Sequence, residues 1–400
     1  MARGIGALRR SQMVSSFGPG ATIDLPEHSV IIGGLDWWPA NKLSRVAEPR
    51  LEEATAKALG LPRVELRAPP VDDETPGSMP VGVQVEIFPL WFVAEHVVKI
   101  GTGRSRPLVH RNSLVNGKYE VNRNLKVPVT PVRFVQACLN GHIADIEWYE
   151  FAHSGRTTCR AQMWIDEFGT SGDLTDQKVR CECNAERALA QATKMDVLGA
   201  CKGQRPWLPR GEECGGPGGV KQMMRLLIRT ASNAYYPQKL SVLSLPESGD
   251  RIRSAVQTVW PMLSAVTDVG MLATLRKIIP AVQAALADFD DALVLQYIEA
   301  EREGRRPPRR PIKMEEYDAL TAAATSLGED RPEGMFFARR LEIVSPPPAV
   351  LSSVERVVLV HRLREVMALV GFTRFEAPLP DEDGELLLDV RRAAIAKDLS

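Results

Sequence analysis

The sequence lacks three features that would assign a function at once. It has no excess charge, because 50 Lys and Arg residues balance 50 Asp and Glu residues in 400 positions, so no global field draws it to nucleic acid or membrane. It has no run of about 18 apolar residues, which excludes a transmembrane helix. No stretch has the Walker phosphate loop, which ends in a Lys-Ser or Lys-Thr pair opening a helix. We therefore expect a soluble, cytoplasmic protein without a phosphate-loop nucleotide site.

Cysteine is also scarce, and the six cysteines are confined to one segment of the chain. The N-terminal ten residues carry Arg3, Arg9 and Arg10, but no apolar run follows, as a signal peptide would require. Reduced thiols are expected in such a protein, which favours a metal site over disulfides. Thiolates are soft ligands that suit Zn²⁺. The cysteines are Cys138, Cys159, Cys181, Cys183, Cys201 and Cys214.

Four of these cysteines form the strongest candidate metal site: Cys181, Cys183, Cys201 and Cys214. The first two form a Cys-x-Cys knuckle, and the other two lie in glycine-rich loops that can bend to close a tetrahedron. We predict one structural zinc ion here. The alternative is that several are small buried hydrophobic residues, an interpretation that suits Cys138 and Cys159 better. An additional site remains open, formed by Cys138, His142, His153 and Cys159.

The N-terminal region, residues 1–98, has the mixed pattern of an α+β fold. Residues 48–59 are predicted to form a helix that Gly60 ends. Residues 68–80 are rich in proline and acidic residues and indicate a loop or linker. Residues 81–93 alternate apolar and polar side chains, which predicts one half-buried strand.

Residues 99–133 are locally basic, with Glu120 as their one acidic residue. A cluster of cations can bind nucleic-acid phosphates, although an ordinary solvated face explains the pattern equally well. We predict that this segment is the DNA-binding surface. Its candidate contact residues are Arg104, Arg106, Arg111, Lys118, Arg123 and Lys126.

The central segment also contains the residue types of an acid–base site. His142, Asp145 and Glu147 lie close together in the sequence, and with a metal ion such a trio could hydrolyse phosphodiesters. A packed, hydrogen-bonded turn is the alternative that we favour, because no matching nucleophile or second acidic cluster is evident. Residues 219–230 that follow are predicted to form an amphipathic helix.

The final third of the chain changes character. Residues 264–302 and 353–370 are predicted to be helical from their composition and periodicity. Between them, residues 302–313 form a basic, proline-rich connector. The fold class is thus α+β and multi-domain, with regions 1–98, 99–250 and 251–400. The second region is loop-rich and zinc-stabilised, and the third is mostly helical.

Motifs spread over most of the chain resemble a known family. The motifs are Arg10-Ser11-Gln12 with Phe17-Gly18-Pro19-Gly20-Ala21, Phe134-Val135-Gln136-Ala137-Cys138 with Gly141-His142, Cys201 with Pro206-Trp207, Ala231-Ser232-Asn233 with Tyr236-Pro237, and His361-Arg362-Leu363-Arg364-Glu365-Val366 with Gly371-Phe372-Thr373-Arg374. The chain resembles the DrmB family, the B subunit of the DISARM anti-phage defence system. Members of that family carry a zinc-binding domain of unknown function and are usually longer.

The resemblance implies a non-enzymatic partner of an SF2-type helicase, the DrmA subunit, that acts on phage DNA beside a methyltransferase. In one motif this chain departs from the family, because Phe88-Pro89-Leu90-Trp91 is followed by Ala94 and His96 where relatives often have a cysteine knuckle. Three function classes are open: a DNA-binding accessory subunit, which we favour; a metal-dependent nuclease or hydrolase built on His142, Asp145 and Glu147; and a zinc scaffold that binds only protein.

Overall fold

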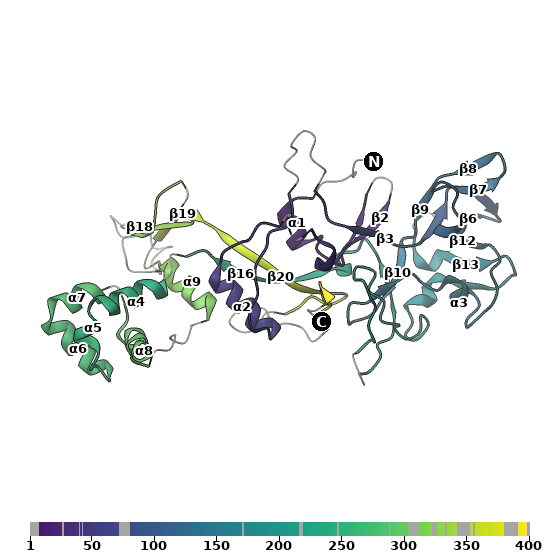
Figure 1. The fold of residues 1–400 in the computed structure, drawn as a ribbon. Coiled ribbons are helices and arrows are strands. Elements are labelled where there is room, and N and C mark those ends of the chain that lie inside the picture. The colour runs from purple at the N-terminus through teal and green to yellow at the C-terminus, as the bar shows by residue number, and fades with distance from the viewer. Residues whose placement is uncertain are drawn as a thin grey trace.

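The protein is elongated, with a strand-rich unit at one end, a helical unit at the other and a long two-stranded ribbon between them (Figure 1). The computed structural model describes residues 8–25, 28–39, 41, 43–71, 81–169, 172–215, 219–245, 248–287, 289–303, 311–321, 326–332, 334–341, 353–354, 357–379 and 391–397. Helices and strands both contribute substantially, so the predicted α+β class is confirmed.

The strand-rich unit is built on an antiparallel sheet in the order β14-β13-β12-β6-β4-β9, with β5 paired to β6. Its strands are β4 (Trp91–Ala94), β5 (Val98–Ile100), β6 (Gly103–His110), β9 (Val129–Pro131), β12 (Met163–Glu167), β13 (Gln177–Cys181) and β14 (Glu186–Ala188). Met163 and Ile165 point to the buried face because alternate residues of a strand share a face. The short helix α3 (Trp148–Ala152) covers that face with Trp148 and Phe151. Burying each such side chain stabilises the fold by about 1.5–3 kcal/mol.

A smaller set of strands forms the middle of the molecule. These are β1 (Thr22–Asp24), β2 (Ser29–Ile32) and β3 (Val85–Ile87) in one sheet, and β10 (Phe134–Ala137), β11 (Ile143–Ala144) and β15 (Arg225–Ile228) in another. The hairpin of β7 (Tyr119–Asn122) with β8 (Leu125–Val127) lies instead at the strand-rich end (Figure 1). Helix α1 (Arg10–Ser15) lies nearby. The apolar core here combines Ile31, Val135, Trp207, Phe372 and Ile395, and so draws on all three regions predicted from the sequence.

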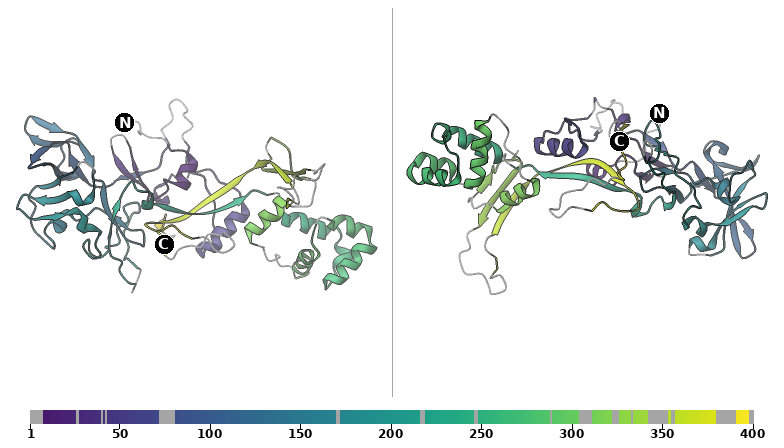
Figure 2. Two further views of the ribbon diagram at one scale, coloured as in Figure 1. Left: turned by 180° about the vertical axis from the view of Figure 1, so that it is seen from behind. Right: turned by 90° about the horizontal axis from the view of Figure 1, so that it is seen from below.

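The ribbon consists of β16 (Tyr236–Leu243) and β20 (Glu365–Thr373), paired antiparallel from Tyr236 with Thr373 to Leu243 with Glu365. It leaves the middle of the molecule and reaches the helical unit (Figure 2). Helix α2 (Pro49–Leu59) packs on it through Leu51, against Val242 and Ala368. This helix ends at Gly60, whose φ is +66°, so the predicted helix and its end are confirmed.

The helical unit contains α4 (Ser248–Thr258), α5 (Trp260–Leu263), α6 (Val269–Ile278), α7 (Pro280–Leu286), α8 (Asp291–Arg302) and α9 (Ile312–Thr321), with a small sheet of β17 (Ser326–Gly328), β18 (Phe336–Leu341) and β19 (Val357–Leu363). Leu263, Leu272, Val282 and Ile298 meet in its core. The helical prediction for residues 264–302 is confirmed in α6, α7 and α8. Most of the predicted basic connector, residues 304–310, and much of the predicted linker, residues 72–80, lie outside the described residues.

Three predicted elements are different in the structure. In residues 353–370, where we expected a helix, the structure has strand β19 and most of strand β20, since a valine-rich segment also suits a pleated strand. Residues 225–228 form strand β15 on β10, because a short apolar run does not distinguish helix from strand. The strand predicted for residues 81–93 is broken into β3 and β4, which belong to different sheets. Pro89, which has no N–H to donate to a sheet, lies at the break.

Within the described residues, no single helix is long and apolar enough to cross a membrane. The helices Val269–Ile278 and Pro280–Leu286 are long and apolar enough only when they are taken together, and their axes are bent by 115° at the break between them.

Candidate metal centres

Two groups of one histidine and three cysteines converge in the described part of the chain, each with its ligand atoms within 4.8 Å of one another. Site 1 comprises Cys138, His142, Cys201 and Cys214, and site 2 comprises His153, Cys159, Cys181 and Cys183. Both sets consist of the sulfur and imidazole donors that a tetrahedral metal ion prefers.

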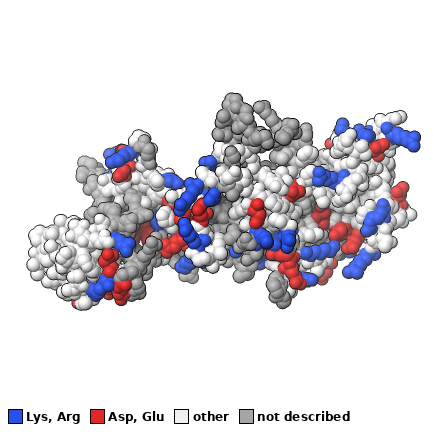
Figure 3. Space-filling view, in the orientation of Figure 1, with Lys and Arg blue, Asp and Glu red and all other residues white. Residues whose placement is uncertain are grey.

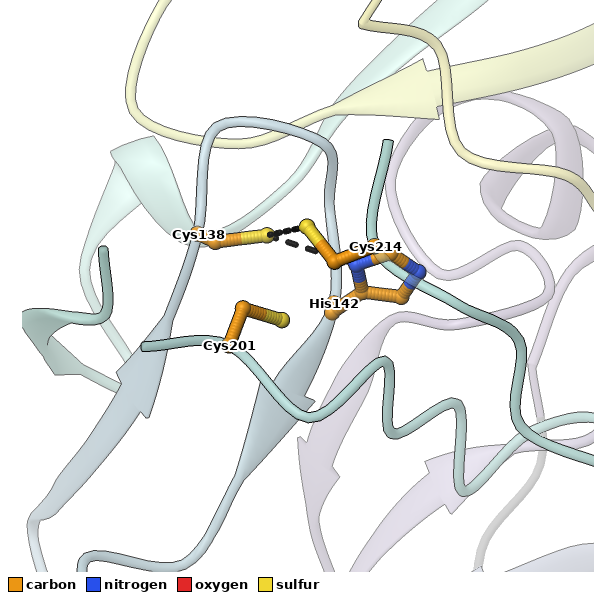
Figure 4. Close-up of side chains that lie close together, drawn as sticks. All are labelled: Cys138, His142, Cys201 and Cys214. Carbon is orange, nitrogen blue, oxygen red and sulfur yellow. Dashed lines mark hydrogen bonds between the residues drawn. The ribbon is translucent and has the colours of Figure 1, made fainter. Parts of the chain in front are cut away.

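Site 1 lies where the β10–β11 hairpin meets two loops (Figure 4). Cys138 and His142 lie on the hairpin, while Cys201 and Cys214 come from the two loops. The Cys138 sulfur is 3.4 Å from His142 Nδ1 and 4.0 Å from the Cys214 sulfur. An ion bound tetrahedrally at about 2.3 Å from each sulfur needs sulfur–sulfur separations of about 3.8 Å. The four side chains therefore fit a tetrahedral ion with little rearrangement.

Two glycines allow the chain to turn at site 1. Gly141 has φ +82°, and its N–H donates to the Cys138 carbonyl over 3.0 Å. Gly203 has φ +71°, and its N–H donates to the Cys201 sulfur over 3.3 Å. A Cβ at Gly203 would lie 1.5 Å from the Glu212 carbonyl oxygen, so only glycine fits there.

A carboxylate behind the histidine orients site 1. His142 Nε2 lies 2.8 Å from Glu212 Oε1, which leaves Nδ1 facing the three sulfurs. Glu212 also pairs with the buried Arg205 over 2.7 Å. A carboxylate that holds the second ring nitrogen is the usual support of a metal-binding histidine, since it fixes the tautomer and raises ligand basicity.

The electrostatics of site 1 favour a thiolate at Cys201 even without an ion. Hydrogen bonds from Cys138 and His142 outweigh burial and lower the pKa of Cys201 to about 4. Burial lowers the pKa of His142, but hydrogen bonds to Cys201 and Glu212 outweigh it and raise that pKa to about 10. The hydrogen bond to Cys201 and burial raise the pKa of Cys138, so this residue stays a thiol without an ion. Because metal ligands are thiolate and neutral imidazole, an ion bound here would displace the protons of Cys138 and His142.

Site 2 lies in the strand-rich unit, where the turn between β13 and β14 meets the end of α3. Cys181 ends β13 and Cys183 follows in the turn to β14, while His153 follows α3. His153 Nε2 is 3.1 Å from the Cys183 sulfur, and its Nδ1 is 2.8 Å from the Tyr149 carbonyl, to which it can donate. The sulfurs of Cys159 and Cys181 are 3.6 Å apart. Cys183 is exposed, whereas every ligand of site 1 is buried.

The structure does not bring the predicted quartet together. Cys181 and Cys183 lie in site 2, and Cys201 and Cys214 lie in site 1. The additional site considered from the sequence is divided in the same way, and Cys138 and Cys159, expected to be buried hydrophobic residues, each join a cluster. The physical reason is strand order, since β13 and β10 belong to different sheets. The signal that we missed is the Cys-x₃-His spacing of Cys138 and His142, which a tight hairpin converts into a pair of ligands.

The predicted DNA-binding residues divide into two sets. Arg104 and Arg106 both pair with Glu167 on the neighbouring strand, the latter over 2.7 Å. Lys126 lies 3.8 Å from Glu120. Lys and Arg are interspersed with Asp and Glu over the strand-rich unit (Figure 3). The exposed residues of the set without an ion pair in the described part of the structure are Arg111, Lys118 and Arg123.

The three residues of the hydrolase alternative have separate partners. His142 belongs to site 1, Asp145 accepts hydrogen bonds from the Leu90 N–H over 3.0 and 3.2 Å, and Glu147 pairs with Lys202 over 2.9 Å. Their side chains are therefore not arranged as one acid–base unit.

Comparison with known proteins places the chain in a family of unknown function. The profile of a family described as "Domain of unknown function (DUF8724)" matches residues 9–236, more than half of the chain. The chain belongs to this family. The matched segment holds all eight residues of sites 1 and 2.

One curated relative is similar over a larger part of the chain. The "DISARM protein DrmB" of Bacillus paralicheniformis (strain ATCC 9945a / NCIMB 11709 / CD-2) is 26% identical over 263 residues, which cover 63% of this chain and 45% of the relative. This match supports the DrmB-like resemblance drawn from the sequence, and the chain spans less than half of the relative's length.

Proposed function

We propose that this protein is a zinc-stabilised accessory subunit of a DISARM-like anti-phage system. In this proposal it is cytoplasmic and non-enzymatic, and it binds DNA together with a DrmA-type helicase subunit, beside a DNA methyltransferase of the same system. The defence role rests on the similarity to the DISARM protein DrmB.

The non-enzymatic role is proposed because both candidate metal sites have a complete set of protein ligands. Each site offers four protein ligands, and a four-coordinate zinc site leaves no position for water or substrate, unlike a catalytic one. Zinc is the ion that we propose because Cys₃His sets are typical of structural zinc. Bound there, it would contribute folding free energy and no chemistry.

The surface proposed for DNA is the β7–β8 hairpin with its flanking turns. It carries Arg111, Lys118 and Arg123, which are exposed, whereas Arg104 and Arg106 share the single carboxylate of Glu167, which cancels one of their two charges. Free cations release condensed counterions when they bind phosphates, and paired ones release fewer. We therefore expect DNA phosphates to contact Arg111, Lys118 and Arg123 rather than Arg104 and Arg106.

The test uses labelled duplex and forked DNA with the purified chain, with and without Mg²⁺ and with and without the helicase subunit. The proposal expects a mobility shift that weakens steeply with salt and no cleavage or ATP hydrolysis by the chain alone. DNA cleavage that is lost in the His142→Ala variant would favour the hydrolase. The absence of both a mobility shift and cleavage, even with the helicase subunit present, would favour a protein-binding scaffold.

A further inference from the structure

A cleft of about 750 Å³ lies beside site 1. Its volume is in the range of small-molecule sites, which is about 300–1,000 Å³. Phe88, Trp91 and His110 form an aromatic wall, and the loops that carry Cys201 and Cys214 form another through Gly203–Arg205 and Gly211–Glu213. Asp145, on the segment that follows β11, also lines the cleft.

Most charges in this cleft are already paired. Glu147 pairs with Lys202 over 2.9 Å, and Glu212 pairs with Arg205 over 2.7 Å. At the rim, Glu213 lies 3.7 Å from Lys221. Both cations of the lining are thus neutralised, which leaves little attraction for an anion.

Asp145 differs from these acids because its only hydrogen bonds in the described residues come from backbone. The Leu90 N–H donates to both carboxylate oxygens, and no ion pair in the described residues involves Asp145. Burial outweighs these hydrogen bonds and raises the pKa of Asp145 to about 6, so it is still mostly ionised at neutral pH. A largely buried carboxylate without a counterion is costly, and a bound cation would offset that cost.

We propose that the cleft binds an organic cation, a guanidinium or ammonium group, with Asp145 as its counterion and Trp91 and His110 as its aromatic wall. Carboxylates form strong, charge-assisted hydrogen bonds with such groups, and ring faces attract them. Burial and the neighbouring Arg111 lower the pKa of His110, so His110 is neutral at pH 7 and does not repel the ligand. Arg111 itself is exposed.

Two sources can supply this chemistry: a basic side chain of a protein partner, or a free polyamine. The site is independent of the DNA surface, because its lining has four carboxylates, Asp145, Glu147, Glu212 and Glu213, against Lys202 and Arg205. An excess of acid disfavours nucleic-acid phosphate, so we favour the cation over a nucleotide.

The experiment titrates the metal-loaded full chain with two matched probes, acetyl-arginine amide and its uncharged analogue acetyl-citrulline amide, and follows the tryptophan indole signals by NMR. We expect the arginine probe to bind at least ten-fold more tightly. Asp145→Asn should remove that difference, while the control Glu150→Gln, at an exposed residue outside the cleft lining, should change it less than about three-fold.

Two further probes complete the test. If spermidine binds more tightly than the arginine probe, the ligand is a free polyamine. If the arginine probe binds more tightly, the ligand is a basic side chain of a protein partner. Equal binding of the arginine and citrulline probes, or binding of deoxyadenosine monophosphate without binding of either cation, would overturn the proposal. Since the arginine and citrulline comparison uses the unmodified protein, the proposal stays falsifiable even if Asp145→Asn fails to fold.

Discussion

Sites 1 and 2 have the same set of ligand types, one histidine and three cysteines, but very different surroundings. Site 1 is buried and joins the β10–β11 hairpin to loops about 60 and 70 residues further along the chain, as their sequence numbers show. Site 2 has an exposed cysteine and lies at the edge of one sheet. An ion at site 1 would therefore tie distant parts of the chain together, whereas an ion at site 2 would stabilise one part of a single sheet.

The largest expected effect is that of breaking site 1. Replacing Cys201 by serine should release its ion and prevent stable folding, because metal binding at structural zinc sites contributes about 10 kcal/mol or more, as much as the whole stability of a typical domain. Soluble yield and thermal unfolding measure the effect. The matched control is Cys183→Ser in site 2, which should remain folded with a smaller loss of stability. Equal losses in both variants would remove the distinction between the sites.

The next effect concerns the side chain that anchors site 1 to the rest of the core. The guanidinium of the fully buried Arg374 donates to the carbonyls of Gly141, Ala234 and Gly20. Replacing it by methionine leaves these acceptors without partners, at about 1–3 kcal/mol each. Denaturant titration should therefore show a loss of several kcal/mol. Arg364→Met, at the far end of the ribbon, serves as the control, and a comparable loss there would count against a special role for Arg374.

A smaller effect is expected behind the histidine of site 1. Glu212→Gln removes the charge that supports His142 and should lower metal affinity about 10–100-fold, as measured by competition with a chromophoric chelator. The neighbouring exposed Glu213 provides the control variant Glu213→Gln, which should change affinity little. The opposite ranking would show that Glu212 does not position the ligand.

The smallest effect concerns DNA affinity at the hairpin. Neutralising Arg111, Lys118 and Arg123 should weaken binding whatever the sequence and reduce the salt slope by about two to three units, since each phosphate contact contributes about 0.9. The double variant Arg104→Gln and Arg106→Gln should change the slope less, because both residues pair with Glu167. A larger change of the salt slope in the double variant would indicate that DNA contacts Arg104 and Arg106, as first predicted from the sequence.

The sequence predicted local features better than long-range ones. Helix α2 and its end at Gly60 follow from capping chemistry, which acts within a few residues. The confinement of the cysteines correctly indicated, in the central segment, groups of side chains that could bind a metal ion. The membership of each quartet could not be predicted, since it depends on which sheet β10 and β13 join. Strand β20 was missed because its partner β16 lies far away in the sequence. Strand β19 pairs with the preceding strand β18 and was missed because its valine-rich segment suits a helix or a strand.

The division of the ligands into two sites is tested most directly by the metal content of the wild-type protein and of Cys183→Ser. Two sites predict two equivalents of zinc in the wild type and one in the variant, because site 1 does not use Cys183. A single site formed by Cys181, Cys183, Cys201 and Cys214 predicts one equivalent in the wild type and none in the variant. That second result would contradict the division of the ligands between sites 1 and 2.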